Sequence, residues 1–347
     1  MGRFFATPRE INTAAWRSIS RPRRRTFVTS ASYGTAVTQA HAARREHRGR
    51  WASNLRRGYP AQMRLSVIVP ARNEVDKLGA QLDALLKQVW DGDWEIIVVD
   101  NDSTDGTAAL VETYATQSDR IRLVHAKDRA DKSYSVMVGI AASDAEALVF
   151  CDADDVVAAG WLAAMAKGLS EHEVVTGPNE LDLLNPSWLA SSRGRSAADA
   201  DETFCGIFPF ARGNNYGVRS TVWQRVGPLM EGYSACEDIE FSLRCWINNI
   251  KIVSLPDAVV HYRYRQSARD LWRQGWRYGT HRPMIARMLR DAGRPTPPRF
   301  SGWKSWVLLV LTIPRTVTRH GRATWLWVAA NRFGQVAGSI RHRIIML

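Results

Sequence analysis

Two aspartates separated by one residue, Asp152-Ala153-Asp154, follow a short apolar run. The apolar residues Ala147–Cys151 are typical of a buried strand that ends where the aspartates begin. If the chain turns there, both carboxylates can face one ligand, and hard oxygen ligands suit Mg²⁺ or Mn²⁺ completed by water and substrate phosphates. Solvated loops also contain such triplets, so the position after a strand carries the argument. It predicts a metal site that neutralises a diphosphate leaving group.

A second polar cluster follows the apolar residues 94–99 and begins at Asp100 and Asn101. These two side chains can hydrogen-bond a nucleobase edge or ribose hydroxyls. Residues 103–107 are expected to be structural, with Ser103 or Thr104 as the N-cap of a helix from residue 104 to about residue 114. Ligand binding by residues 100 and 101 is compatible with a structural role for residues 103–107.

A third acidic pair, Glu237-Asp238, lies near the start of a helix predicted over residues 236–248. A helix N-terminus favours carboxylates, so the pair is also compatible with an ordinary acidic first turn. A carboxylate whose pKa is tuned by its neighbours can instead act as a general base.

The elements that must position these residues alternate along residues 64–151. Strands are predicted at 65–69, 94–99, 121–124 and 147–151, and helices at 75–89, 104–114 and 132–142. This alternation predicts an α/β fold with a parallel sheet and right-handed crossovers. Ligands of such sheets bind beyond the carboxyl ends of the strands, where residues 72–74, 100–102 and 152–155 lie.

The chain is predicted to have three parts: residues 1–62, an α/β domain over 63–265, and a basic, Trp-rich helical region over 266–347. Residues 185–202 are expected to form a mobile loop, and 250–253 and 258–260 short strands. The apolar runs at 306–313 and 323–330 are too short to span a bilayer. With arginines beside them, they suit helices in a membrane interface or a hairpin packed on the domain.

Most of the net charge of +13 lies at the N-terminus, where residues 1–60 contain 13 Arg and only two acids. This segment is compatible with a disordered tail, with translation that begins instead at Met63, with a basic arm for membrane or nucleic acid, or with an organelle transit peptide. Four cysteines without a CxxC pair favour neither a disulfide framework nor a zinc site, so a reducing cytoplasm is expected.

The motifs together resemble family 2 glycosyltransferases of the GT-A fold, over roughly residues 64–280. The resemblance rests on the order and spacing of residues 67–74, 98–107, 152–155, 213–215, Glu237-Asp238 and His261. It implies a GT-A, Rossmann-like, mostly parallel sheet flanked by helices and followed by a C-terminal helical extension. It also implies an inverting transfer from a nucleoside-diphosphate sugar to a hydroxyl of a glycan, lipid-linked or other envelope acceptor.

The resemblance implies roles for individual residues. Asp238 would be the catalytic base, Asp154 the direct metal ligand and Asp152 nearer the ribose or a metal-bound water. Mn²⁺ or Mg²⁺ would be the cofactor, with His261 completing its site unless it is an ordinary surface or core histidine. The nucleotide-sugar contacts would also include Pro70, Arg72, Asn73, Glu74, Asp100, Asn101 and Lys132, and the acceptor and donor pocket would include Asn214, Asn215 and Glu237.

Two departures from the family narrow this expectation. Asn101 stands where the family often has an Asp that recognises uracil, so the identity of the nucleobase in the sugar donor stays open. The Gln-x-x-Arg-Trp motif of processive synthases is absent and only echoed by residues 274–278, which favours addition of one or few sugars. A cytoplasmic enzyme at the inner face of a membrane is expected, without a specific nucleic-acid partner. A nucleotidyltransferase and a catalytically inactive basic adaptor are the alternatives.

Overall fold

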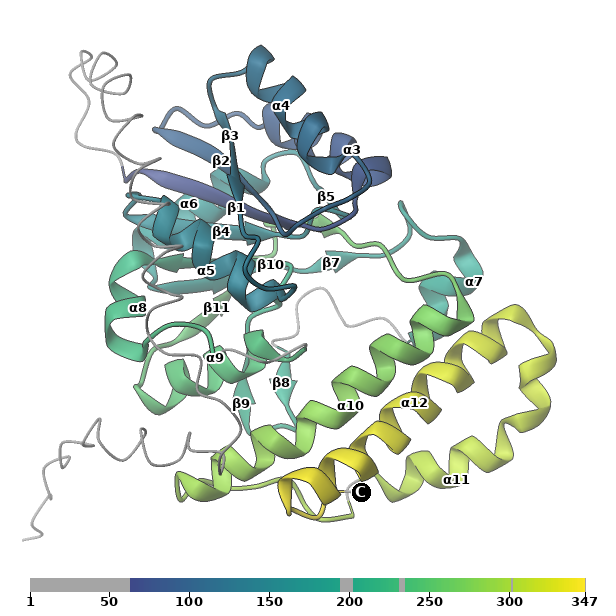
Figure 1. Ribbon diagram of the computed structural model, residues 1–347. Helices are drawn as coiled ribbons and strands as arrows, with labels where there is room; N and C mark the ends of the chain where they lie inside the picture. Colours follow the sequence, from purple (N-terminus) through teal and green to yellow (C-terminus); the bar gives the residue numbers. More distant parts are fainter. Residues whose placement is uncertain (1–62, 194–201, 231–234, 301, 347) are drawn as a thin grey trace, which may run out of the picture.

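The computed structural model describes residues 63–193, 202–230, 235–300 and 302–346, so the predictions for residues 1–62 lie outside the described part. Its centre is a seven-stranded sheet in the order β11-β6-β10-β4-β1-β2-β3 (Figure 1). Only β10 runs antiparallel to its neighbours within this sheet, which confirms the mostly parallel α/β fold. The strands are β1 (Leu65–Ala71), β2 (Trp94–Asp100), β3 (Ile121–His125), β4 (Ala147–Cys151), β6 (Val174–Thr176), β10 (Asn215–Arg219) and β11 (Ile252–Ser254).

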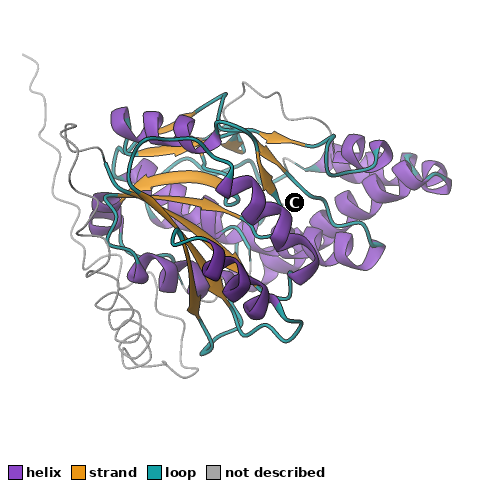
Figure 2. Cartoon of the chain, turned by 90° about the horizontal axis from the view of Figure 1, so that it is seen from above, coloured by secondary structure: helices purple, strands orange, loops and turns teal. Residues whose placement is uncertain are grey.

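Helices cover both faces of the sheet and each face has its own apolar core (Figures 1 and 2). The strands are buried on both sides, which explains why they read as continuous apolar runs. One face packs against α3 (Val75–Leu86), α4 (Thr107–Gln117) and α6 (Trp161–Glu171). The other packs against α5 (Lys132–Ala142), α8 (Ser220–Val226) and α9 (Glu237–Ile247).

The parallel register brings the predicted site residues to one edge of the sheet. Ala71 at the end of β1 pairs with Asp100 at the end of β2, and β4 lies on the other side of β1. A small sheet of β5 (Val156–Val157), β12 (Val260–His261) and β7 (Asn179–Glu180) follows directly after the acidic triplet. Within it His261 pairs with Val156, two residues after Asp154.

Several predictions about local structure were wrong. Helix α3 ends at Leu86 rather than at residue 89, and the strand expected at 258–260 lies at Val260–His261. Helix α4 begins at Thr107 rather than near residue 104, because Gly106 adopts a left-handed φ of 93° and interrupts the helix. Ser103 and Thr104 do not cap it and instead bond the backbone and side chain of Asn73. The expected loop over 185–202 includes α7 (Ser187–Ala190) and a 3₁₀ turn (Ser191–Arg193), while 194–201 lie outside the described residues.

The C-terminal region consists of α10 (Ala268–Asp291), α11 (Trp303–Leu311), a 3₁₀ turn (Ile313–Val317) and α12 (Arg319–His342), which lie to one side of the sheet (Figure 1). Within the described residues, no helix is long and apolar enough to cross a membrane. Helix α11 and the following turn expose an apolar surface, here called the α11 face, made of Trp303, Val307, Leu308, Val310, Leu311, Ile313 and Val317.

Helices α10 and α12 lie side by side (Figure 1) and approach closely at glycines on both helices. A Cβ atom at Gly279 would lie 2.2 Å from the carbonyl oxygen of Asn331, and one at Gly338 would lie 2.3 Å from that of Thr280. These backbone atoms cannot move aside without separating the helices, so the glycines set the distance between α10 and α12.

We therefore expect Gly279→Ala to lower the free energy of unfolding by about 1–3 kcal/mol, the usual cost of overpacking. The matched control is Gly79→Ala in α3, where the nearest atom to an added Cβ is the Tyr114 hydroxyl at 3.5 Å. That variant should be neutral or gain up to about 1 kcal/mol in helix propensity. Urea unfolding measures both, and equal effects of the two changes would contradict the close approach.

Candidate functional site

Three carboxylates crowd the end of β4, and each has a different partner. Asp152 forms an ion pair with Lys132 at 2.6 Å, and Asp154 forms one with Arg265 at 2.7 Å. Asp155 is fully buried and accepts hydrogen bonds from the Asn214 side chain and the Arg263 backbone, both at 2.8 Å. Burial and mutual repulsion raise the pKa of Asp152 and Asp155, so this site has a strong demand for positive charge.

Lys132 links the end of β4 to the start of α9. It is the first residue of α5, whose N-cap Asp131 accepts hydrogen bonds from Ser133 and Tyr134. Besides Asp152, its amine lies 3.8 Å from Glu237 and donates to the Gly213 carbonyl. Burial opposes its charge, but the carboxylates of Asp152 and Glu237 outweigh this and raise the Lys132 pKa well above its ordinary value. Lys132 therefore stays a cation.

Asp238 lies in the first turn of α9, where one carboxylate oxygen accepts from the Gly213 backbone N–H and the other from the Ile239 N–H, both at 2.8 Å. A Cβ at position 213 would lie 2.8 Å from Asp238 Oδ2, so only glycine allows this approach. Burial and the neighbouring Glu237 charge raise the pKa of Asp238 to about 7. A carboxylate with this pKa can accept a proton near neutral pH.

Arg265 is the site residue that the sequence analysis missed. It lies 2.7 Å from Asp154 and 4.0 Å from Glu74, so it joins the ends of β4 and β1. Burial and the charge of Asp154 raise the pKa of Glu74, while its ion pair with Lys77 opposes that rise. No motif marks Arg265, which is one of several basic residues after β12 and becomes significant only through its contacts.

The predicted nucleotide-contact residues end β1 and β2, and several are engaged with neighbouring loops. Asp100 is buried and lies 3.3 Å from the ring nitrogen of His125. The amide nitrogen of Asn101 donates to the carbonyls of Ala126 and Arg129, which holds the segment after β3. Pro70 is half-buried in β1, Arg72 and Asn73 are exposed, and Asn73 adopts a left-handed φ of 54°.

Asn214 and Asn215 have different surroundings. Asn214 contacts Asp155 and therefore belongs to the acidic cluster. Asn215 is fully buried, and both polar atoms of its side chain form structural hydrogen bonds. The amide nitrogen donates to the carbonyls of Pro178 and Ala258, and the amide oxygen accepts from the Trp161 indole. The structure thus places Asn215 beneath the site as a brace between segments.

The residues fit a divalent cation completed by substrate oxygens. Asp152 and Asp154 supply hard oxygen atoms, and each already attracts a cationic side chain. In the described part of the chain, no three His, Cys, Asp or Glu side chains are close enough to enclose a metal by themselves. The Nδ1 atom of His261 lies 2.7 Å from Glu180, the arrangement that commonly orients a metal-binding imidazole through its other nitrogen.

The arrangement therefore combines an anion-binding end and a proton-accepting end. Lys132 and Arg265 stand beside the β4 carboxylates, where phosphates and a divalent cation would balance one another. Asp238 lies across Lys132 from them, on a different element, with a pKa of about 7. Such a site can stabilise a departing diphosphate while it removes a proton from an incoming hydroxyl.

Comparisons with known proteins agree with this chemistry. Family models described as "Glycosyl transferase family 2" and "Glycosyl transferase family group 2" match residues 66–186 and 147–333. A "PGL/p-HBAD biosynthesis glycosyltransferase" of Mycobacterium tuberculosis is 28% identical over 205 residues, which cover 56% of this chain and 74% of the relative.

Two solved structures share the fold. A mannosyltransferase from Pyrobaculum calidifontis in complex with GDP-Man and Mn²⁺ has a TM-score of 0.58 at 17% identity and covers 87% of this chain and 97% of its own. GalNAc-T7 with UDP, GalNAc and Mn²⁺ has a TM-score of 0.52 at 14% identity, with 70% and 55% covered. At these identities the likeness shows the fold alone.

The raised pKa of Asp238 predicts a pH-dependent stability. Its carboxyl ionises at about 4 in an unfolded chain but at about 7 in the native protein. The native state therefore binds more protons between these values, and its stability is lost as pH rises through that window. Relative to Asp238→Asn, we expect the free energy of unfolding to fall from about pH 4 to about pH 7 and then level off. Urea unfolding at each pH measures this, and a constant difference would contradict the assignment.

Proposed function

Because the chain belongs to glycosyltransferase family 2, we propose that it moves one sugar from a nucleoside-diphosphate sugar to an acceptor hydroxyl with inversion at the anomeric carbon. The observation that carries this proposal is the position of Asp238. Its carboxylate is anchored by Gly213, has a pKa of about 7, and lies next to the Glu237–Lys132–Asp152 chain that would face the donor phosphates.

At the donor end, Lys132 and Arg265 would bind the diphosphate oxygens, and Asp154 and Asp152 would hold Mn²⁺ or Mg²⁺. Such a cation supplies charge neutralisation for the leaving nucleoside diphosphate. The structural neighbours solved with Mn²⁺ and a nucleotide or nucleotide sugar support this assignment. Pro70, Arg72 to Glu74, Asp100 and Asn101 would line the nucleotide side, because they end the two strands next to β4 in that direction.

At the acceptor end, Asp238 would take the proton of the attacking hydroxyl. The acceptor oxygen forms a bond to the anomeric carbon while the bond from that carbon to the phosphate oxygen breaks, and the electron pair leaves with the diphosphate. A single displacement needs no covalent nucleophile, only a base on one side and charge stabilisation on the other. Asn214 and Glu237, which contact Asp155 and Lys132, would complete the wall between the two ends.

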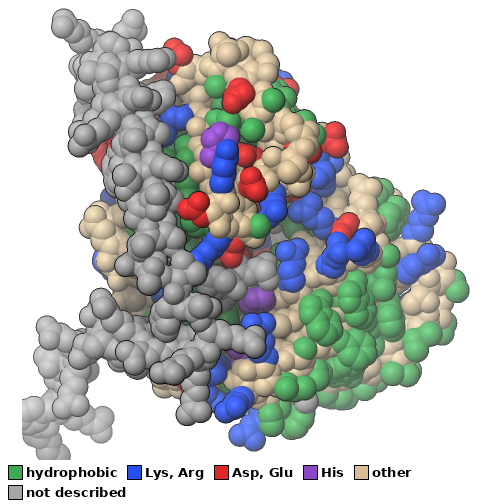
Figure 3. Space-filling model, viewed as in Figure 1, with side chains coloured by type: hydrophobic (Ala, Val, Ile, Leu, Met, Phe, Trp, Pro, Cys, Tyr) green, Lys and Arg blue, Asp and Glu red, His purple; other side chains and the backbone are tan. Residues whose placement is uncertain are grey.

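The acceptor we propose is lipid-linked or part of the cell envelope, reached by peripheral contact with the inner face of a membrane. The C-terminal helices support this, because the α11 face is apolar and exposed, while no acidic residue follows Asp291 in a segment rich in Arg. Figure 3 shows the hydrophobic surface with Lys and Arg around it. Apolar side chains with flanking cations suit an interface with anionic lipids. By comparison, helix α12 packs against helix α10.

Replacement of the base tests the proposal. We expect Asp238→Asn to lower kcat by about 100-fold or more, because general base catalysis typically contributes that much. Binding of the nucleotide should be retained, because the change removes no donor contact. For the wild type, kcat/KM should fall about tenfold per unit below about pH 7 as Asp238 becomes protonated.

The matched control is Asp257→Asn, which removes an exposed carboxylate in the turn before β12. Its activity should equal that of the wild type. Thermal unfolding confirms that each variant is folded. If Asp238→Asn keeps near-wild-type turnover, or if both variants lose activity equally, Asp238 is not the base.

A further inference from the structure

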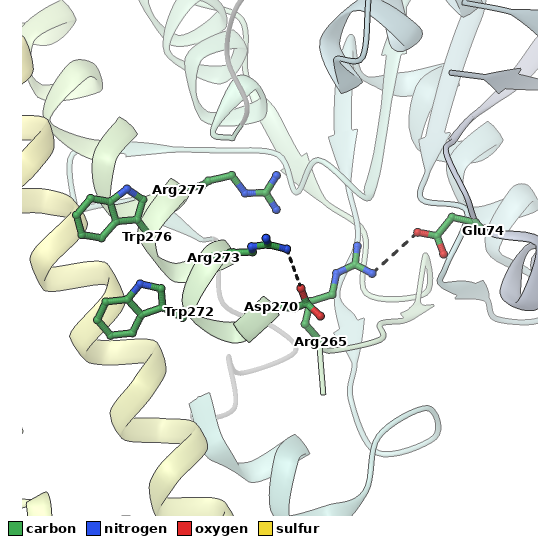
Figure 4. A pocket seen from close by; sticks show the side chains of 7 residues that line it. All are labelled: Glu74, Arg265, Asp270, Trp272, Arg273, Trp276 and Arg277. Carbon is green, nitrogen blue, oxygen red and sulfur yellow. Dashed lines mark ion pairs between the residues drawn. The ribbon is translucent and has the colours of Figure 1, made fainter. Parts of the chain in front are cut away.

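A pocket of about 870 Å³ lies between the loop that follows β1 and the first half of α10. Glu74 and Arg265 lie at one end, and the remaining lining residues come from α10: Asp270, Trp272, Arg273, Trp276 and Arg277. In Figure 4 the guanidinium groups of Arg273 and Arg277 point across the pocket toward Arg265 and Glu74, and the two indole rings lie together at the opposite end. The pocket thus has a charged end and an aromatic end.

At its charged end, the pocket contains positively charged side chains that remain available to bind an anion. Glu74 already pairs with Lys77, and Arg265 is engaged with Asp154. Arg273 reaches only Asp270, at 3.8 Å, and the Asp270 carboxylate also accepts a hydrogen bond from the hydroxyl of Ser267, the N-cap of α10. Among the described residues, no ion pair involves Arg277. Two guanidinium groups are therefore available to a ligand, and planar guanidinium forks fit the oxygens of a phosphate group.

The pocket adjoins the reaction centre through Arg265. Arg265 joins it to Asp154, the proposed metal ligand. A ligand in the pocket consequently lies next to the end of β4, where the leaving group would be held and which an acceptor must approach.

The aromatic end leads to the α11 face. Trp272 contacts Phe333 of α12 with ring centroids 6.4 Å apart, and Phe333 contacts Trp306 of α11 at 5.3 Å. Trp276 is 38% exposed. Figure 3 shows Lys and Arg side chains just above the broad hydrophobic surface of the C-terminal helices. A row of rings therefore runs from the cationic pocket to an exposed apolar surface.

We infer that this pocket binds the phosphate group of an amphiphilic acceptor that also carries the attacking hydroxyl, with Arg273 and Arg277 on the phosphate and the hydrocarbon along Trp272, Trp276 and the α11 face. This assignment rests on the proposed function, because it names the acceptor class for that reaction centre. We assign this phosphate to the acceptor, because Arg273 and Arg277 come from α10 and form no ion pair with the β4 carboxylates. Lys132 and Arg265 do form such pairs, and Arg265 lies where the donor site meets this pocket.

Calorimetric titration with farnesyl phosphate, farnesol and inorganic phosphate tests the pocket. We expect farnesyl phosphate to bind at least about tenfold more tightly than either of the others, because it offers both the anion and the hydrocarbon. The double change Arg273→Gln with Arg277→Gln should weaken the binding of farnesyl phosphate by about tenfold or more, because charge-assisted hydrogen bonds are lost. Binding of UDP and GDP with Mn²⁺ should not change.

The matched control is Arg287→Gln with Arg290→Gln, two exposed arginines further along α10 that contact Asp291 outside the pocket. This control should bind farnesyl phosphate as the wild type does. Unchanged binding in the Arg273 and Arg277 variant, or no preference of the wild type for farnesyl phosphate, overturns the inference. Loss of UDP and GDP binding with farnesyl phosphate retained assigns the pocket to the donor, which also overturns it.

The measurements with UDP and GDP distinguish a failure of the pocket assignment from a failure of the proposed function. If the wild type binds neither UDP nor GDP and transfers no sugar, the proposed function fails, whatever happens to farnesyl phosphate. If the nucleotides bind but the arginine changes leave farnesyl phosphate unaffected, only the pocket assignment fails.

Discussion

The crowding of Asp152, Asp154 and Asp155 at the end of one buried strand is the constraint on which the rest of the site depends. Like charges in a partly desolvated space repel, and the raised pKa values of Asp152 and Asp155 express that cost. The chain offsets it with two cations from distant segments, Lys132 and Arg265. A cluster that still favours further positive charge is well suited to a divalent cation and its phosphate ligands.

The fold supplies these partners through its parallel strands. Because β1, β2 and β4 run in the same direction, their ends and the helices that follow meet at one edge. Lys132 then reaches from the first turn of α5 to both Asp152 and Glu237, so one side chain connects the proposed donor end with the helix that carries the proposed base. Gly213 completes the connection, because a larger residue would displace Asp238.

The sequence predicts the elements that repeat regularly and the acids that follow them. Helix α5 has the bounds expected from its pattern, and strand β4 ends directly before the acidic triplet. The contacts of Arg265 could not be foreseen, because they join segments far apart in the chain and depend on three-dimensional position. The start of α4 was missed because the left-handed backbone at Gly106 competes with the capping pattern. Likewise, the buried hydrogen bonds of the Asn101 and Asn215 side chains could not be foreseen, because they depend on tertiary packing and not on a sequence motif.

Together, the β4 carboxylates and a divalent cation are proposed to hold a nucleoside-diphosphate sugar. Differential scanning fluorimetry with UDP-, GDP- and dTDP-sugars, with Mn²⁺ and with excess EDTA, tests this proposal most directly. A ligand that binds the native state raises its apparent stability by mass action. We expect at least one nucleotide sugar to stabilise the wild type with Mn²⁺ but not with EDTA, and to have no effect on Asp154→Ala. Equal stabilisation in EDTA, or in the Asp154→Ala variant, would contradict the account.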